Sequence, residues 1–182
     1  MQNKNASLLK ICHLILIFAG AALCIYGCTF DGASVIDEAA LLLKIAALAA
    51  SFVYLLKGYQ KNADLCYKAF MWLLGIAEII GYTSLLTKGI PMPFFRGFIS
   101  VMTFVAFILI IGAKDYGKTK SSIISVALVV FCACSAVSEA AASMPAVLSL
   151  PAVIAICRFF FAATAALMVR AKYNDKDARG AK

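Results

Sequence analysis

Long uninterrupted apolar runs dominate this chain, and its polar residues gather between them. Six runs are each long enough to cross ~30 Å of hydrocarbon as a helix. Because apolar residues follow one another without period-two alternation, we predict helices and not barrel strands. The pattern predicts an all-α integral membrane protein whose six transmembrane helices lie near Leu8–Cys28, Glu38–Leu56, Cys66–Leu86, Gly97–Ala113, Ser122–Ala142 and Leu150–Val169.

The linkers between the runs are short, and the runs themselves recur at a regular spacing. Pro91 and Pro93 interrupt the third linker. Odd runs begin about 55 residues apart, and so do even runs, which is the spacing of an internal repeat. The even runs also end alike, in LLKGYQKN, IIGAKDYGK and MVRAKYNDK. We therefore predict three tandem helical hairpins forming one domain over residues 1–170, followed by a mobile basic tail over residues 171–182.

Composition supports the membrane assignment and excludes other classes. The chain is 64% hydrophobic and 14% charged, with a mean hydropathy of +0.94. A soluble domain is roughly 45–50% apolar and about 25% charged. Soluble, disordered and nucleic-acid-binding proteins are thus excluded as descriptions of the whole chain. The lipid bilayer is the expected partner, and nucleic acid is not.

The net charge of +8 is distributed unevenly along the chain. If the six runs span a membrane, Lys88 and Arg96 lie on one side, while Lys44 and Arg158 lie within spans. The other 13 Lys and Arg residues lie on the opposite side. The positive-inside rule then places both termini in the cytoplasm. We expect a multi-pass protein of the cell membrane.

Four ionisable residues within the spans are the candidate site: Lys44, Glu78, Glu139 and Arg158. Counting ~1.5 Å per helical residue places all four in the outer half of the bundle. Burying any one of them alone costs at least ~3 kcal/mol. They either pair as structural supports or line a cavity that binds a polar small molecule or lipid headgroup. We predict a Glu78–Lys44 contact, with Arg158 as the second choice for Glu78.

The remaining reactive residues favour a protein without catalysis. His13, the only histidine, shares its depth with Ser51 and Ser125, but no carboxylate inside a span lies at that level to orient it. The seven cysteines contain no C-x-x-C pair, so we expect no metal. No nucleotide-binding or zinc-protease motif occurs, and we expect no cofactor. Whether two cysteines form an inter-helix disulfide stays open.

The three-hairpin plan resembles the HdeD-type small six-helix membrane proteins. The resemblance covers the whole chain and is carried by LLGIAEIIGYTSLL, with Gly75 and Gly81, and by the LIIGAK and LMVRAK endings. The first linker lacks the proline found in the third and fifth. The resemblance implies a six-helix fold without assigned enzyme chemistry. Those proteins are associated with acid-stress resistance.

A second resemblance is to the lysoplasmalogenase (YhhN) family, which has a lysine on its second span and Gly-Asp on its third. Lys44 in LLLKIAALAAS and Glu78 in LLGIAEII occupy similar places. The chain departs from that family by carrying Glu instead of Asp. It also lacks a His and a Tyr in GFISVMTFVAFILIIGA and has two spans fewer. The resemblance implies an intramembrane hydrolase whose activity these differences would impair.

A third alternative is the substrate-capturing membrane subunit of a vitamin transporter. Six spans, this length and cytoplasmic termini are similar to such subunits. The alanine pattern by which they dock to their energising partner is not evident in ICHLILIFAGAALCIYG. This interpretation implies a partner subunit, and a homo-oligomer is the other assembly that we consider.

Overall fold

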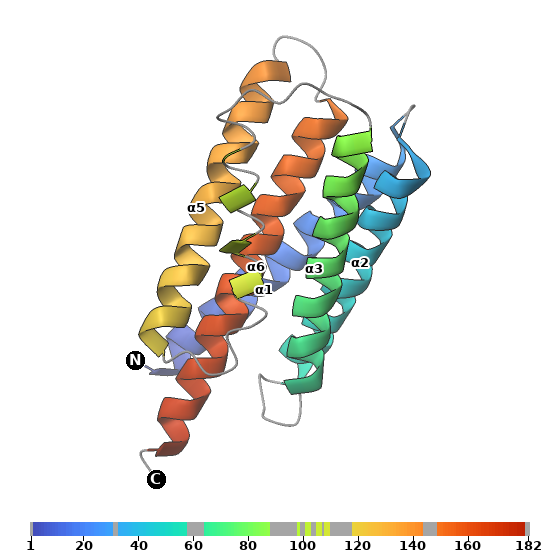
Figure 1. The fold of residues 1–182 in the computed structure, drawn as a ribbon. Helices are drawn as coiled ribbons and strands as arrows, with labels where there is room; N and C mark the ends of the chain where they lie inside the picture. The colour runs from blue at the N-terminus through green and yellow to red at the C-terminus, as the bar shows by residue number, and fades with distance from the viewer. Residues whose placement is uncertain are drawn as a thin grey trace.

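Five long helices form the described part of the chain in a computed structural model (Figure 1). The structure describes residues 2–30, 33–57, 64–87, 118–143 and 149–180, and single positions or pairs between 98 and 109. The helices are α1 (Gln2–Cys28), α2 (Val35–Leu56), α3 (Asp64–Thr87), α5 (Lys118–Ser143) and α6 (Leu150–Gly180). No strand occurs among these residues, so the all-α prediction is confirmed for them.

Four stretches of these helices are long and apolar enough to cross a membrane: Ser7–Cys28, Val35–Leu56, Thr119–Ala141 and Leu150–Lys172. Their outward faces carry large apolar side chains, such as Ile15 and Phe18 on α1 and Val126 and Val130 on α5. So much exposed apolar surface is unusual in a soluble protein and is expected where lipid is the solvent. The chain is a small integral membrane protein.

Part of the predicted topology lies outside the described residues. Most of the fourth predicted span, Gly97–Ala113, belongs to this part, although positions 98, 101–102, 105–106 and 108–109 have helical backbone. The count of six helices, the threefold hairpin plan and the orientation of the termini therefore remain predictions.

The last helix is longer than the sequence pattern suggests. The apolar run ends at Val169, but α6 continues to Gly180. Most of the predicted tail thus has helical backbone. The segment AKYNDKDAR contains neither proline nor glycine, the two residues that most strongly disfavour a helix. Hydropathy marks where a helix leaves the apolar layer, whereas helix-breaking residues mark where the helix itself ends.

A capping box fixes where α2 begins. The Asp37 N–H donates to Ser34 Oγ over 3.2 Å, and the Ser34 N–H donates to Asp37 Oδ2 over 3.0 Å. This arrangement satisfies two backbone donors that the helix itself leaves unpaired. From this start a stripe spaced three and four residues apart is buried along α2: Asp37, Ala40, Leu41, Lys44, Ala47, Leu48, Ser51, Tyr54 and Leu55. The stripe carries both Lys44 and Ser51 into the bundle.

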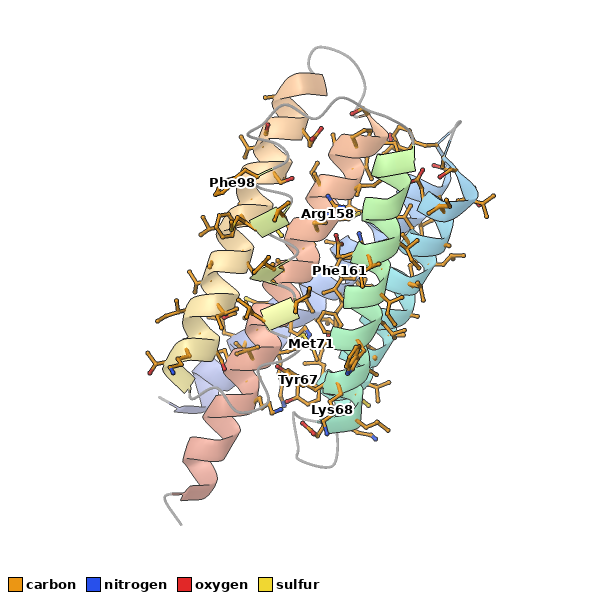
Figure 2. All side chains as sticks on the ribbon, viewed as in Figure 1. Tyr67, Lys68, Met71, Phe98, Arg158 and Phe161 are labelled. Carbon is orange, nitrogen blue, oxygen red and sulfur yellow. The ribbon has the colours of Figure 1, made fainter. Side chains whose placement is uncertain are left out.

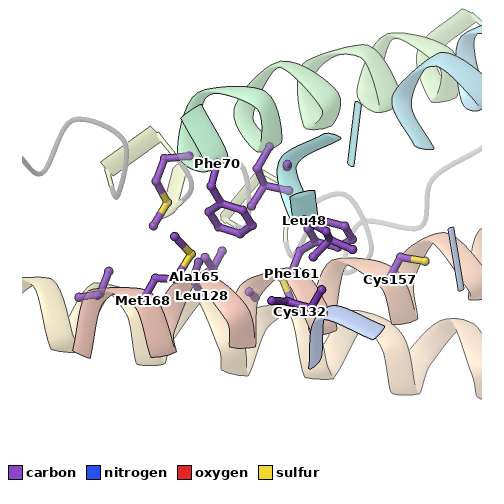
Figure 3. Packing of buried hydrophobic residues seen from close by; sticks show 14 of the residues in the cluster. Leu48, Phe70, Leu128, Cys132, Cys157, Phe161, Ala165 and Met168 are labelled. Carbon is purple, nitrogen blue, oxygen red and sulfur yellow. The ribbon is translucent and has the colours of Figure 1, made fainter. Parts of the chain in front are cut away.

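Helix α6 is the most enclosed element of the described bundle. In the most apolar stretch of α6, 61% of the residues are buried. The corresponding share is 22% in α1 and in α5. It packs against α5 and α1 and touches α3 over a smaller area, while α2 lies between α1 and α3. Figure 3 shows the resulting core, in which Phe161, Ala165 and Met168 of α6 lie near Leu48 and Phe70. Residues on the inner face of α6 can therefore meet three other helices.

Candidate functional site

Glu78 of α3 is the centre of a buried ionic cluster. Its Oε1 lies 2.8 Å from Nζ of Lys44 on α2, and its Oε2 accepts a hydrogen bond of 2.7 Å from Nε of Arg158 on α6. The structure thus brings three of the four candidate residues together, from three helices. We call Lys44, Glu78 and Arg158 the ionic cluster. Figure 2 places Arg158 in the half of the bundle away from Tyr67 and Lys68.

All three members of the ionic cluster are removed from solvent. The exposed fractions are 2% for Lys44, 0% for Glu78 and 6% for Arg158. Glu139, the fourth candidate, lies on α5 and is only half-buried, so it does not share this degree of burial. Two buried basic side chains thus share one buried carboxylate.

The two contacts of Glu78 differ in kind. Arg158 donates a well-directed hydrogen bond to Oε2. The Lys44 ammonium is equally near Oε1, but no hydrogen bond of acceptable geometry reaches that oxygen. Lys44 is therefore held by charge attraction, and Arg158 by attraction and hydrogen bonding together. Charge-assisted hydrogen bonds are about twice as strong as neutral ones, so Arg158 fixes the orientation of the carboxylate.

A second buried polar group lies on α1, α2 and α6. His13 Nε2 is 2.7 Å from Ser51 Oγ, and the Ser51 hydroxyl donates to Met168 Sδ over 3.2 Å. Depth alone matched His13 with Ser51 in the sequence, and the structure places them in contact. Which of the two atoms donates in the His13–Ser51 hydrogen bond depends on the tautomer of the imidazole. Both side chains are also fully buried, so Ser51 is not presented to a substrate.

Charged residues at the opposite end of the bundle join α3 to α6. Asp64 lies 2.7 Å from Lys68 Nζ and accepts a hydrogen bond of 3.0 Å from Lys172 Nζ. Lys172 also lies 4.2 Å from the centre of the Tyr67 ring. The hydrogen bond from Lys68, assisted by Lys172, holds the pKa of Asp64 below its ordinary value although partial burial opposes this. The sequence does not show this bridge, because Asp64 and Lys172 lie far apart in the chain.

The chemistry available at the ionic cluster is electrostatic. A carboxylate held between two cations is a poor base, because its charge is already neutralised. The two cations supply hydrogen-bond donors. A Lys ammonium carries three N–H groups and an Arg guanidinium carries five, one of which is at Nε. A methyl group built on Gly81 would lie 3.7 Å from Arg158 Nη2, so the absence of a side chain at 81 leaves space beside the guanidinium. The arrangement is suited to holding a negative charge.

Neither a metal centre nor a relative explains these residues. In the part of the chain that the structure describes, no three His, Cys, Asp or Glu side chains are grouped so that they could hold a metal ion. Comparison with known proteins gives no match to a family model, a curated protein or a solved structure. The function has to be inferred from the ionic cluster itself.

Proposed function

We propose that this membrane protein binds an anionic group, a phosphate or carboxylate of a lipid headgroup or small molecule, at the ionic cluster. The observation that carries the proposal is that two buried basic side chains, Lys44 and Arg158, converge on one buried carboxylate, Glu78. Ionisable residues inside a membrane protein are functional candidates by default. Lys and Arg side chains carry only N–H donors, which suit contact with an anionic oxygen.

The arrangement also explains why a carboxylate is present at an anion site. Glu78 lies between the two cations and keeps Lys44 and Arg158 at defined positions through contacts of 2.8 and 2.7 Å. Without Glu78, two like charges would repel each other in a low-dielectric interior. The carboxylate therefore orients both cations. The predicted depth of these residues favours entry of the ligand from the outer leaflet.

Native mass spectrometry of the protein purified in a mild detergent tests this proposal. We expect an anionic adduct on the wild type and its loss in Lys44→Met, which leaves the neutral Glu78–Arg158 pair in place. Lys68→Met is the matched control, because Lys68 is 44% exposed and lies at the other end of α3. An adduct that persists unchanged in Lys44→Met, or a wild type without any adduct, would overturn the proposal.

A second measurement separates the two sources of the anion. Delipidated protein is mixed with phosphatidylglycerol in one sample and with inorganic phosphate in another, and its thermal unfolding is followed. A ligand that binds only the folded state raises the unfolding temperature. A shift with lipid alone identifies a headgroup site, and a shift with both identifies a site for the free anion. No shift in either sample contradicts anion binding.

Hydrolysis of ether lysolipids, implied by the lysoplasmalogenase resemblance, is less well supported. Glu78 is held between two cations, and Ser51 is enclosed. We therefore expect no release of aldehyde from lysoplasmalogen by the purified protein above the level of a protein-free blank. Turnover that disappears in Glu78→Gln but survives in Lys68→Met would reverse this conclusion.

A further inference from the structure

The inner face of α3 is closed around Glu78 and becomes accessible one turn later, at Gly81. Leu74, Ala77 and Glu78 lie on this face, and each of them is 0% exposed. Gly81 follows Glu78 by three residues, so it lies on the same side of the helix. Gly81 is nevertheless partly exposed. Position 81 can therefore be reached from outside the bundle, directly beside the ionic cluster.

Arg158 is the member of the ionic cluster that borders this opening. A methyl group built on Gly81 would lie 3.7 Å from Arg158 Nη2, and apart from the adjoining part of α3 no other described atom lies within 4 Å of it. Arg158 is also the most exposed of the three, at 6% compared with 2% for Lys44 and 0% for Glu78. Figure 2 places Arg158 where α6 faces α3. A group that enters at position 81 therefore meets the guanidinium first.

Close helix packing does not explain the glycine at this position. At Gly27 an added methyl group would lie 2.9 Å from Leu41 Cδ1, and at Gly20 it would lie 3.3 Å from Leu48 Cδ1. Those two glycines allow helices to approach each other closely. The 3.7 Å at Gly81 is an ordinary contact distance. Because glycine is also among the least favourable residues inside a helix, what it provides at position 81 is open space beside a cation.

The two helices that border the opening touch each other only sparingly. Helix α3 packs extensively against α2, whereas its contact with α6 is limited. Beside Gly81 the two helices are joined by the 2.7 Å hydrogen bond from Arg158 Nε to Glu78 Oε2. An incoming group at this level therefore does not have to separate a tightly packed pair of helices.

We infer that Gly81 is the specificity-determining residue of the anion site, because the space that it leaves between α3 and α6 admits the anionic group to Arg158. This inference rests on the proposed function, since it names the route by which the anion reaches the ionic cluster. A guanidinium presents planar N–H groups that match two oxygens of one phosphate or carboxylate. A side chain larger than a methyl group at position 81 would occupy the space that these oxygens need.

Chemical labelling of position 81 tests the opening without any ligand. Gly81→Cys is treated in detergent with anionic sulfonatoethyl methanethiosulfonate or with its cationic trimethylammonium analogue. Peptide mass mapping separates residue 81 from the seven native cysteines. We expect the ratio of the anionic to the cationic rate to be about ten-fold higher in the folded protein than in the denatured protein, because Arg158 and Lys44 attract the anion. No modification of residue 81 in the folded protein, or equal ratios in the two states, would overturn the inference.

A binding experiment tests the role of side-chain size at position 81. Delipidated wild type, Gly81→Ala and Gly81→Leu are each titrated with phosphatidylglycerol and with inorganic phosphate, and the rise in unfolding temperature gives the affinity. We expect Gly81→Ala to bind within about two-fold of the wild type and Gly81→Leu to bind about ten-fold more weakly or less. Ala69→Leu is the matched control, because it adds bulk at a half-buried position of α3 about 18 Å away.

The outcomes separate this inference from the proposed function. Binding that is retained in Gly81→Leu would overturn the role of Gly81 and leave anion binding in place. Equal weakening in Ala69→Leu and Gly81→Leu would also overturn that role, because added bulk anywhere on α3 would then suffice. A wild type that binds neither probe would overturn the proposed function and this inference together. If Gly81→Leu does not fold, the labelling of Gly81→Cys decides.

Discussion

At the scale of single residues, the unusual feature is one carboxylate shared by two buried cations. A buried ion pair contributes little net stability, because desolvation offsets most of the attraction. Removing one partner is a different matter, since it leaves a charge without compensation. Lys44, Glu78 and Arg158 therefore do not contribute equally. Loss of Glu78 removes the carboxylate that both cations share, whereas loss of Lys44 leaves the Glu78–Arg158 pair in place.

This asymmetry predicts an order of stability among three variants. We expect Glu78→Gln to be destabilised by about 3–5 kcal/mol. Lys44→Met should lose less, because Glu78 and Arg158 remain paired. The double variant should unfold at a higher temperature than Glu78→Gln alone, because it also removes the buried Lys44 ammonium that Glu78→Gln deprives of its carboxylate. Thermal unfolding in detergent measures all three. Losses that simply add would show that Lys44 and Glu78 do not interact.

Asp64 supplies a pH-dependent contribution at the other end of the bundle. Its pKa lies below the ordinary 3.8 because Lys68 and Lys172 stabilise the carboxylate. A group with a lowered pKa in the folded state stabilises the fold above its unfolded pKa, and this contribution is lost as pH falls through the folded pKa. We expect Asp64→Asn to lower the unfolding temperature at pH 7 by an amount equivalent to no more than about 1 kcal/mol, since the site is partly exposed.

The same comparison at pH values progressively below the ordinary 3.8 provides the control for Asp64. There the wild-type carboxylate is increasingly protonated, so the difference between the wild type and Asp64→Asn should shrink. A difference that is independent of pH would mean that Asp64 stabilises the fold by packing and not by charge.

At the scale of helices, the sequence predicts well that a helix exists and which of its faces is buried. It predicts less well where a helix ends and which other helices it contacts. Hydropathy identifies α1, α2, α5 and α6 as apolar helices because crossing a membrane requires a long run. Depth and the adjacency of consecutive helices suggest Glu78 as the partner of Lys44. Depth also makes Arg158 the second choice for Glu78, but the sequence does not show that both cations meet the same carboxylate, because that depends on α6 reaching α3.

Close packing of α1 predicts a difference between two identical substitutions. Gly27→Ala and Gly81→Ala each replace a helical glycine, so both gain similar helix propensity. At 27 the added methyl would lie 2.9 Å from a side-chain atom of fully buried Leu41, whereas at 81 its nearest contact is an ordinary 3.7 Å from Arg158. We expect Gly27→Ala to be about 1–3 kcal/mol less stable than Gly81→Ala. Equal unfolding temperatures would show that α1 can move away without cost.

At the scale of the whole molecule, α6 connects the parts that carry chemistry. It contributes Arg158 to the ionic cluster, Met168 to the His13–Ser51 pair and Lys172 to the bridge with Asp64. These residues follow one another along the helix from the Arg158 end to the Lys172 end. A helix enclosed by its neighbours can hold several polar groups, because each group finds partners on the surrounding helices.

The final prediction concerns how this bundle is oriented in the membrane. The uneven distribution of Lys and Arg predicts that both termini are cytoplasmic. The test uses two single variants, Ala33→Cys and Ala178→Cys. Ala33 lies in the connection between α1 and α2, and Ala178 lies near the end of α6. In intact cells a membrane-impermeant maleimide should label position 33 and not position 178, and permeabilised cells should show both. The unsubstituted protein is the blank for its native cysteines. Labelling of position 178 alone in intact cells would invert the topology, and the ionic cluster would then face the cytoplasmic leaflet.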